Sequence, residues 1–187
     1  MPVATFLAFI ERAARALSSR ARNLYYRALG VEIAGYVWLR KIDIPRNFGE
    51  ISLAKGVALD NGVVLLATGE PTGRKKIIIG ENTYINRNTF IDASAEVRIG
   101  RNVGIGPSCY ITDHDHGMAP TQFVMDQPLV SKPTTIGDGV WLGANVIVLK
   151  GVTIGVNTVV AAGSLVARDL PTDVIADGRP ARPLKKR

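Results

Sequence analysis

Both histidines of this 187-residue chain lie in one short segment, Ile111–Gly117. Imidazole has a pKa close to neutral, so a histidine in such a loop can take a proton from a hydroxyl group as a general base. His114 follows Asp113, and Asp115 separates it from His116. Either carboxylate, or a main-chain carbonyl, could accept the second ring proton and fix the orientation of the base. The segment therefore predicts acid–base chemistry.

The composition of the chain limits its compartment, its partners and its relation to membranes. The single cysteine, Cys109, excludes a disulfide framework and a cysteine-based metal site and is typical of a reducing compartment, so a cytoplasmic location is expected. The net charge of +7 suits an anionic ligand, a nucleic acid or an anionic membrane surface. The apolar stretch Phe6–Ile10 ends at Glu11 and is too short for a signal peptide core or a spanning helix. We therefore expect a chain that is neither secreted by that route nor transmembrane.

The chain around the histidines has a six-residue repeat. Aliphatic residues recur every six positions in runs that begin at Ile79, Ile99 and Ile136, and each of these positions holds Ile, Leu or Val. Cys109 occupies the small position of one repeat, so we interpret it as a repeat residue rather than a reactive thiol. A period of six fits neither a helix nor a simple alternating strand, but it fits a short strand followed by a tight corner. Three such sides make one coil of a prism, and neighbouring coils stack at about 4.8 Å.

The corners and interruptions of the repeat indicate where function lies. Glycine or asparagine follows many aliphatic positions, as at Gly80 and Asn86, where we expect the left-handed backbone of a sharp corner. The register extends loosely back to Ile33, which gives about six coils. Interruptions fall only between complete triplets, and the longest, between Ile111 and Ile136, contains both histidines. A long insertion in a regular fold is often functional.

Residues 4–29 have the periodicity of an amphipathic helix. Its apolar stripe consists of Phe6, Ile10, Ala13, Leu17, Ala21, Leu24 and Ala28. We expect the stripe to cap the open end of the coil, because solenoid ends need a cover. The alternative is a peripheral membrane anchor of the basic amphipathic type. The predicted organisation is an N-terminal helix at 1–30, a coil domain at 31–170 with an inserted loop at 112–135, and a C-terminal basic segment at 171–187.

Several motifs are similar to those of the hexapeptide-repeat acyltransferase superfamily. They are Ile136–Asn145, Gly151–Gly155, Ala162–Ser164 and Asp177–Arg182. Within it, the chain resembles sugar O-acetyltransferases of the galactoside, maltose, capsule and exopolysaccharide type. The resemblance implies an all-β, left-handed parallel β-helix of about six coils, with an N-terminal amphipathic helix and a long loop inserted between coils. It alone implies the left hand, since parallel crossovers are otherwise right-handed. It also implies a homotrimer with active sites between neighbouring prisms.

The resemblance further implies transfer of an acetyl group from acetyl-CoA, as co-substrate, to a hydroxyl of a sugar or polysaccharide precursor. The base of this family lies three residues after the last aliphatic residue of its coil, which corresponds to His114. Transfer is then direct, in a ternary complex. Asn86 corresponds to an acceptor-binding residue, and Asp92 to a second one with a displacement of about two positions. His116 has at most a supporting role beside the acceptor.

The same resemblance assigns residues to CoA. Trp141 corresponds to the tryptophan beside the pantetheine arm, and the backbone amide of Ala144 to the donor that stabilises the thioester carbonyl. Lys150, Arg168 and Arg182 lie near the nucleotide end of the groove, where basic side chains suit the phosphates. No metal is expected.

Several other functions are alternatives to acetyl transfer to a hydroxyl. An amino sugar or a xenobiotic amine is an alternative acceptor, because related N-acetyltransferases share the coils and the base. A non-catalytic β-helix scaffold would not need the His114 loop, Trp141 and the basic ending together. A γ-class carbonic anhydrase binds zinc through three histidines, and this chain has two. Nucleic-acid binding is disfavoured because few aromatic residues interleave with the basic ones.

Overall fold

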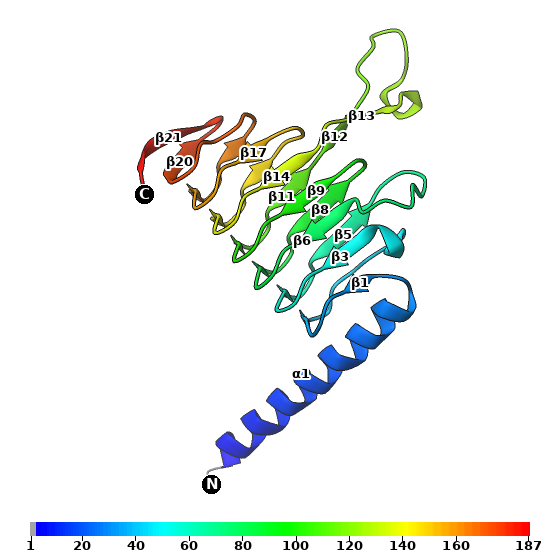
Figure 1. The fold of residues 1–187 in the computed structure, drawn as a ribbon, viewed down its shortest axis with the longest axis vertical. Helices are drawn as coiled ribbons and strands as arrows, with labels where there is room; N and C mark the ends of the chain where they lie inside the picture. Colours follow the sequence, from blue (N-terminus) through cyan, green and yellow to red (C-terminus); the bar gives the residue numbers. More distant parts are fainter. Residues whose placement is uncertain (1–2) are drawn as a thin grey trace.

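The chain forms a stack of short parallel strands with one long helix at its N-terminal end (Figure 1). The computed structural model describes residues 3–187, with side chains from Ala8 onward. The helix is α1 (Val3–Ala28), and two short 3-10 helices are η1 (Phe48–Glu50) and η2 (Val124–Asp126). The fold is therefore mostly β with an N-terminal helix, as the repeat and the helical periodicity of residues 4–29 predict.

Three sheets form the sides of the stack. The first sheet contains β1 (Glu32–Ile33), β3 (Ile51–Leu53), β6 (Ile77–Ile79), β9 (Val97–Ile99), β14 (Thr134–Ile136) and β17 (Thr153–Ile154). The second contains β2 (Trp38–Leu39), β4 (Ala58–Leu59), β7 (Tyr84–Ile85), β10 (Gly104–Ile105), β15 (Trp141–Leu142), β18 (Val159–Val160), β20 (Val174–Gly178) and β21 (Ala181–Lys186). The third contains β5 (Val64–Ala67), β8 (Phe90–Ala93), β11 (Tyr110–Thr112), β16 (Ile147–Val148) and β19 (Leu165–Val166).

The chain visits the three sheets in turn, and each strand pairs in parallel with the strand of the same side one turn later. The predicted insertions fall at one corner, after third-sheet strands. They follow β5, β8 and β11, and the one after β8, between Ile91 and Ile99, adds only two residues. The one after β11 carries the antiparallel hairpin β12 (His114–His116) and β13 (Leu129–Ser131). The C-terminal basic segment continues the stack, because β20 pairs with β18 and β21 folds back antiparallel on β20.

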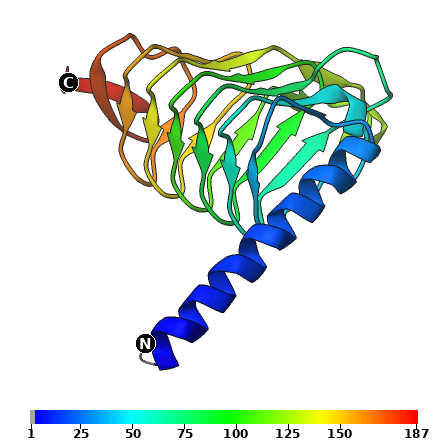
Figure 2. The ribbon, with the colours of Figure 1, turned by 60° about the horizontal axis from the view of Figure 1, so that its bottom comes forward.

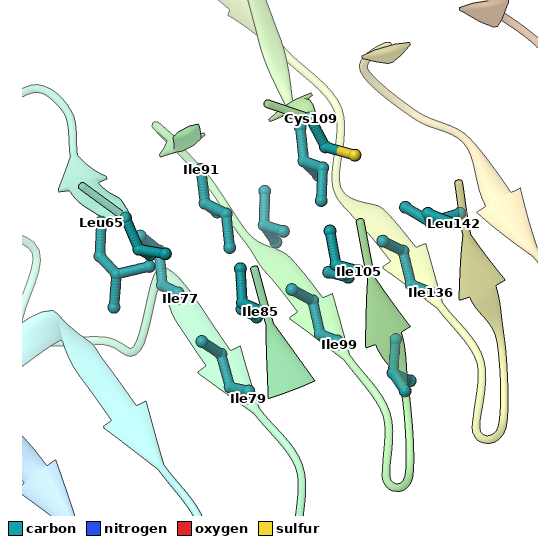
Figure 3. Close-up of a cluster of buried hydrophobic side chains, with 14 of the residues drawn as sticks. Leu65, Ile77, Ile79, Ile85, Ile91, Ile99, Ile105, Cys109, Ile136 and Leu142 are labelled. Atoms are coloured by element: carbon teal, nitrogen blue, oxygen red, sulfur yellow. The ribbon is translucent and has the colours of Figure 1, made fainter. Parts of the chain in front are cut away.

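The repeat aliphatics fill the interior. Ile85, Ile105 and Leu142 are register neighbours in the second sheet and are essentially fully buried, and Figure 3 shows them in successive layers. Cys109 is buried beside them, and burial raises the pKa of its thiol. The interpretation of Cys109 as a repeat residue is confirmed.

The corners differ from the prediction in one respect. The left-handed conformation lies three residues after the aliphatic position, as at Asn82 (φ 55°) and Asn88 (φ 59°), and not directly after it. Gly80 is needed for another reason, since a Cβ there would lie 2.6 Å from the backbone of Gly100 in the next coil. Gly80 therefore permits close stacking, whereas asparagine makes the turn.

The outward side chains give the three sides different characters. The outer row of the first sheet is largely polar: Glu32, Ser52, Ile78, Arg98, Thr135 and Thr153. The second has Trp38, Ala58, Tyr84, Gly104, Trp141 and Val159. The third has Val64, Phe90, Tyr110, Ile147 and Leu165. Two of the three sides are thus apolar outside as well as inside.

The prediction that the apolar stripe of α1 contacts the first coil is wrong. The helix does lie against the first coil, but through Ser19, Asn23 and Tyr26, which are buried. The stripe residues Leu17 and Leu24 are instead 64% and 72% exposed. The side chain of Phe6, also assigned to the stripe, lies outside the described residues. Hydrogen bonds, described below, replace the expected apolar contact.

Candidate active site

The candidate site lies at the corner where third-sheet strands end. Leu66, Asp92 and Thr112 are register neighbours in β5, β8 and β11. Directly after Thr112 the chain leaves the coil, with Asp113 turned inward and His114 opening the hairpin. The stacked strands therefore fix the starting point of the inserted loop.

Asp113 is completely buried and holds four hydrogen-bond donors. Its Oδ1 accepts from the amide of Ser94 (2.8 Å), and its Oδ2 accepts from the amides of Ala95 (2.7 Å) and Glu96 (2.5 Å). Burial acts to raise the pKa of Asp113, but the bonds from His114 and the three amides outweigh it and hold this pKa below its ordinary value. The side chain is an ionised, rigid anchor.

The fourth donor is the ring of His114. Its Nδ1 lies 2.9 Å from Oδ1 of Asp113, and the side chain is only 9% exposed. The Asp113 hydrogen bond raises the pKa of His114, burial opposes this, and the charges of Asp92 and Asp115 add to the rise. An ionised carboxylate at Nδ1 selects the tautomer with the proton on that nitrogen, which leaves a lone pair on Nε2. The geometry is that of an oriented general base.

Asp92 faces the other side of the ring. Its Oδ2 lies 3.8 Å from Nε2 of His114, and its Oδ1 accepts a hydrogen bond of 2.5 Å from Thr68. The backbone carbonyl of Thr68 in turn accepts from the buried Lys76, which pairs with Glu50. The loop after β5 is thereby tied to the site, and Asp92 is held in place beside the expected base.

The remaining hairpin residues have other roles. Asp115 points to the opposite side of β12 and pairs with Lys150 at 2.8 Å, and Lys150 also donates to the carbonyl of Val130. The hairpin is thus fastened to the next coil, and Lys150 is engaged there, although we expected it near the CoA phosphates. His116 is exposed, opposite Leu129 in the hairpin.

A second feature lies on the outer side of the second sheet. Trp141, which is 58% exposed, borders a cavity of about 240 Å³ together with Gly143, Ala144 and the segment 159–162. Among the described residues, the amides of Gly143 and Asn145 donate to backbone carbonyls, while no hydrogen bond uses the amide of Ala144. This amide is free to donate to a ligand in the cavity.

The two features lie at different corners of one chain. Ala144 and Asn86 belong to the corner that precedes the third sheet, and His114 to the corner that follows it. Within residues 3–187, no hydrogen bond, ion pair or cavity joins His114 to Trp141, Ala144 or Asn86. The structure thus brings Asp92 to His114 but does not bring Asn86 there.

Comparison with known proteins places these features in a family. The profile described as "Bacterial transferase hexapeptide (six repeats)" matches residues 133–168. The putative lipopolysaccharide biosynthesis O-acetyl transferase WbbJ of Escherichia coli is 34% identical over 149 residues, which cover 75% of this chain and 74% of WbbJ. The chain belongs to the hexapeptide-repeat acetyltransferase family. The resemblance drawn from its motifs is confirmed.

Two further proteins are similar to this chain over a shorter segment. Galactoside O-acetyltransferase of E. coli is 39% identical over 110 residues, covering 59% of this chain and 54% of that enzyme. A hexapeptide-repeat acetyltransferase from Vibrio cholerae, solved with acetyl coenzyme A, has 40% identity and a TM-score of 0.57, covering 60% of this chain and 61% of that one. The chain spans about half the length of the first curated relatives it matches.

Some residues of the site were not found by sequence reasoning. The amides of Ser94, Ala95 and Glu96 come from the two-residue interruption between Ile91 and Ile99, which has no distinctive side chains. Thr68 lies in the insertion after β5, and only its position at the same corner as Asp92 could have indicated it. Arg168 and Arg182 are exposed, Arg182 on β21, and they remain predicted phosphate ligands.

Proposed function

We propose that this protein transfers an acetyl group from acetyl-CoA to a hydroxyl of a sugar or polysaccharide precursor. The proposed scaffold is a left-handed parallel β-helix of about six coils, and the proposed base is His114. The observation that carries the proposal is the bond between Nδ1 of His114 and the buried carboxylate of Asp113, with Nε2 left beside Asp92. The CoA-bound relatives and the names of the O-acetyltransferases support the same reaction.

In the proposed reaction, Nε2 of His114 takes the proton of the acceptor hydroxyl as its oxygen attacks the thioester carbonyl carbon. The negative charge that develops on the carbonyl oxygen is stabilised by the free amide of Ala144. Collapse of the tetrahedral intermediate breaks the carbon–sulfur bond, and the CoA thiolate takes the proton from Nε2. Asp113 stabilises the imidazolium that exists between these two steps.

The proposed CoA site is the cavity beside Trp141, whose indole would pack against the pantetheine arm. Arg168 and Arg182 are proposed to reach the phosphates, because their charged groups are exposed on the later coils. Asp92 would accept a hydrogen bond from the acceptor sugar beside the base. Asn86 would contact the acceptor from a neighbouring subunit, since it lies at the other corner of its own chain.

The proposed assembly is a homotrimer. The apolar outer rows of the second and third sheets can pack against each other between neighbours, and such a heterologous contact closes into a ring. The hairpin tip supports this assembly, because Met118, Phe123 and Met125 are 77%, 83% and 81% exposed in a loop that projects from the stack (Figure 1). The assembly would bring His114 of one subunit to the Trp141 cavity of the next.

The decisive experiment is an acceptor screen with acetyl-CoA, in which free thiol release is measured with sugars, amino sugars and nucleotide sugars. We expect release with a hydroxyl acceptor, its loss in His114→Ala, and a smaller effect in the matched control His116→Ala. Thiol release at an undiminished rate by His114→Ala would refute the mechanism.

An amine acceptor is the second candidate, and Asp92 is the observation that favours it. A carboxylate beside Nε2 could hold an ammonium group as readily as a hydroxyl. Product analysis in the same screen separates the two, since an amide survives mild alkaline hydrolysis and an ester does not.

The proposed setting is the cytoplasm, with peripheral contact between α1 and the inner face of the membrane. The units proposed are the helix at 1–30, the coil domain at 31–170 and the basic segment at 171–187. Among the described residues, no helix is both long and apolar enough to cross a bilayer.

A further inference from the structure

The helix α1 has two opposite faces, and only one of them is used by the fold. Ser19 donates to the carbonyl of Val37 and accepts from the amide of Leu39, and Asn23 also donates to the carbonyl of Val37. Tyr26 donates to the carbonyl of Ile42. These bonds satisfy backbone groups at the open end of the first coil, so the fold does not require the apolar stripe.

The apolar stripe points away from the coil. At 3.6 residues per turn, Leu17 and Leu24 lie roughly 140–160° around the helix from Ser19, and Ile10 lies roughly opposite it. Ile10, Leu17 and Leu24 are 47%, 64% and 72% exposed. Figure 2 shows the N-terminal half of α1 extending away from the stack. The exposed side chains of the stripe therefore form an open ridge along the helix.

Basic residues line both flanks of the helix, between this ridge and the coil. On one side a pocket of about 270 Å³ between the helix and the first coils is lined by Arg15, Arg22, Arg40 and Lys41. On the other side Arg20 and Arg27 line a pocket of about 420 Å³. The helix carries five arginines and one acidic residue, Glu11, which pairs with Arg15.

Several of these cations make contacts that leave capacity for a ligand. Arg22 donates one bond to the carbonyl of Leu39, and Arg40 lies 3.7 Å from Asp60. A guanidinium has five N–H donors, so each retains others. Lys41 and Arg20 have no ion pair among the described residues. The pockets therefore keep a net positive charge.

We propose that α1 is a docking surface for an anionic phospholipid membrane. The apolar stripe enters the interface between headgroups and acyl chains, and the two basic pockets take the lipid phosphates. This inference gives the proposed membrane contact its residues and lipid class, and it does not depend on acetyl transfer. The positive charge on both flanks of the helix, beside an exposed apolar stripe, is the observation that selects this partner.

Charge argues against a second copy of the chain as the occupant. Pairing two such stripes face to face would bring two helices of net positive charge together, and like charges in apposition are unfavourable. An anionic lipid surface supplies the opposite charge on both flanks of the helix at once. A bilayer also accommodates a ridge that projects away from the fold.

The test is sedimentation of the full chain with phosphatidylcholine vesicles that contain, or lack, phosphatidylglycerol. We expect binding only to the anionic vesicles, and weaker binding as salt is raised. Leu17→Gln with Leu24→Gln should lower the affinity by about tenfold or more. The matched control is Val156→Gln with Leu184→Gln, two exposed apolar residues outside α1, which should bind as wild type.

A second pair of variants tests the charge. Arg15→Gln with Lys41→Gln should lower the affinity by about fivefold per cation. Arg98→Gln with Lys186→Gln removes the same charge elsewhere and should have little effect. Melting curves and acetyl transfer to a soluble acceptor should be unchanged in all of these variants.

Three results would overturn the inference. The first is vesicle binding by the Leu17→Gln, Leu24→Gln protein at wild-type affinity. The second is the absence of wild-type vesicle binding, combined with a smaller oligomer in that variant, which would assign the stripe to contact between copies. The third is binding of inorganic phosphate without binding to vesicles. His114→Ala should still bind vesicles. The vesicle test can therefore be interpreted even if the proposed acetyl transfer is refuted.

Discussion

Replacement of Asp113 by asparagine tests the central feature of the site. The carboxylate accepts from two donors at each oxygen: Ser94 and His114 at Oδ1, and Ala95 and Glu96 at Oδ2. An amide keeps only one acceptor oxygen. Whichever way it is turned, an NH₂ group faces two donors that have lost their acceptor.

The expected loss of stability follows from the number of donors that lose their acceptor. A buried donor left without a partner costs about 1–3 kcal/mol, so two such donors predict a loss of about 2–6 kcal/mol. For a chain of this size that corresponds to a fall in melting temperature on the order of 10 °C. The rate should fall further, by about 10²–10⁴-fold, because the imidazole loses both its orientation and the charge that stabilises its protonated form.

The pH dependence gives the most specific readout. Because Asp113 raises the pKa of His114, the base is free only above that raised pKa, and activity should rise with pH through it. Removing the charge lowers the pKa of His114, so the rising limb of kcat/KM should move to lower pH in Asp113→Asn. The stability that the pair contributes in wild type is lost at low pH as Asp113 is protonated, and at high pH as His114 is deprotonated.

The assay is thiol release as a function of pH, with calorimetric CoA binding to show that the protein is folded. Asp115→Asn is the matched control, since that carboxylate pairs with Lys150 and does not contact the ring. Its charge adds less to the pKa of His114 than Asp113 does, so the limb should move less in this variant. If Asp113→Asn kept the wild-type rate and the wild-type position of the limb, Asp113 would be a structural anchor and nothing more.

Three further changes test the site and the core. His114→Ala should lower the acetylation rate by about 10²–10⁴-fold. It should leave CoA binding nearly unchanged and lower the melting temperature modestly, because the buried Asp113 loses one of its four donors. His116→Ala, which changes an exposed side chain, should cost less rate and less stability. Trp141→Ala should raise the KM for acetyl-CoA about tenfold at similar kcat, measured by initial rates, because the indole forms a wall of the cavity. Ile105→Ala should destabilise the protein by about 2–5 kcal/mol in urea unfolding, because its buried side chain would leave a hole between layers.

The repeat made most of the fold predictable because each of its positions has one physical task. An aliphatic residue at every sixth position fills the interior, as at Ile85 and Ile105, and this determined which residues are buried. The location of the turns was less predictable. Glycine serves both close packing and left-handed backbone. The residue type therefore did not reveal that Gly80 is needed for packing and that the turn is made at Asn82.

The helix was misread because periodicity finds an apolar face but not the surface it contacts. The stripe was assigned to the coil since burial is the usual fate of such a face. The first coil instead presents unpaired carbonyl and amide groups at Val37 and Leu39, which need polar partners such as Ser19 and Asn23. Those partners have no pattern visible in a hydrophobic profile.

The sequence singled out the central residue of the candidate site, but it did not predict the contacts around that residue. His114 was found because both histidines lie at a break in the repeat. Asp113 and Asp115 could not be distinguished by sequence, since each is adjacent to His114, and only the fold determines which one turns inward toward three free amides. That Asp92 faces Nε2 follows from its alignment with Thr112 across the sheet.

The separation of His114 from the Trp141 cavity leads to a last prediction about assembly. If each site takes its base from one subunit and its cavity from the next, two inactive variants can complement each other. One is His114→Ala, which keeps the cavity, and the other is Ala162→Trp, which fills the cavity with an indole and keeps the base. A mixed trimer then contains an intact site wherever an Ala162→Trp subunit presents its base to a His114→Ala neighbour.

Random reassembly of the two variants in equal amounts makes this combination at about one quarter of the sites in a cyclic assembly. We therefore expect the mixture, after dissociation and reassembly, to recover about a quarter of the wild-type thiol release, while each variant treated alone stays inactive. Mixing without dissociation is the control and should recover nothing. A site built within one subunit has no such route to recovery, so a mixture that stayed inactive after proven exchange of subunits would place base and cavity in the same chain and refute the shared site.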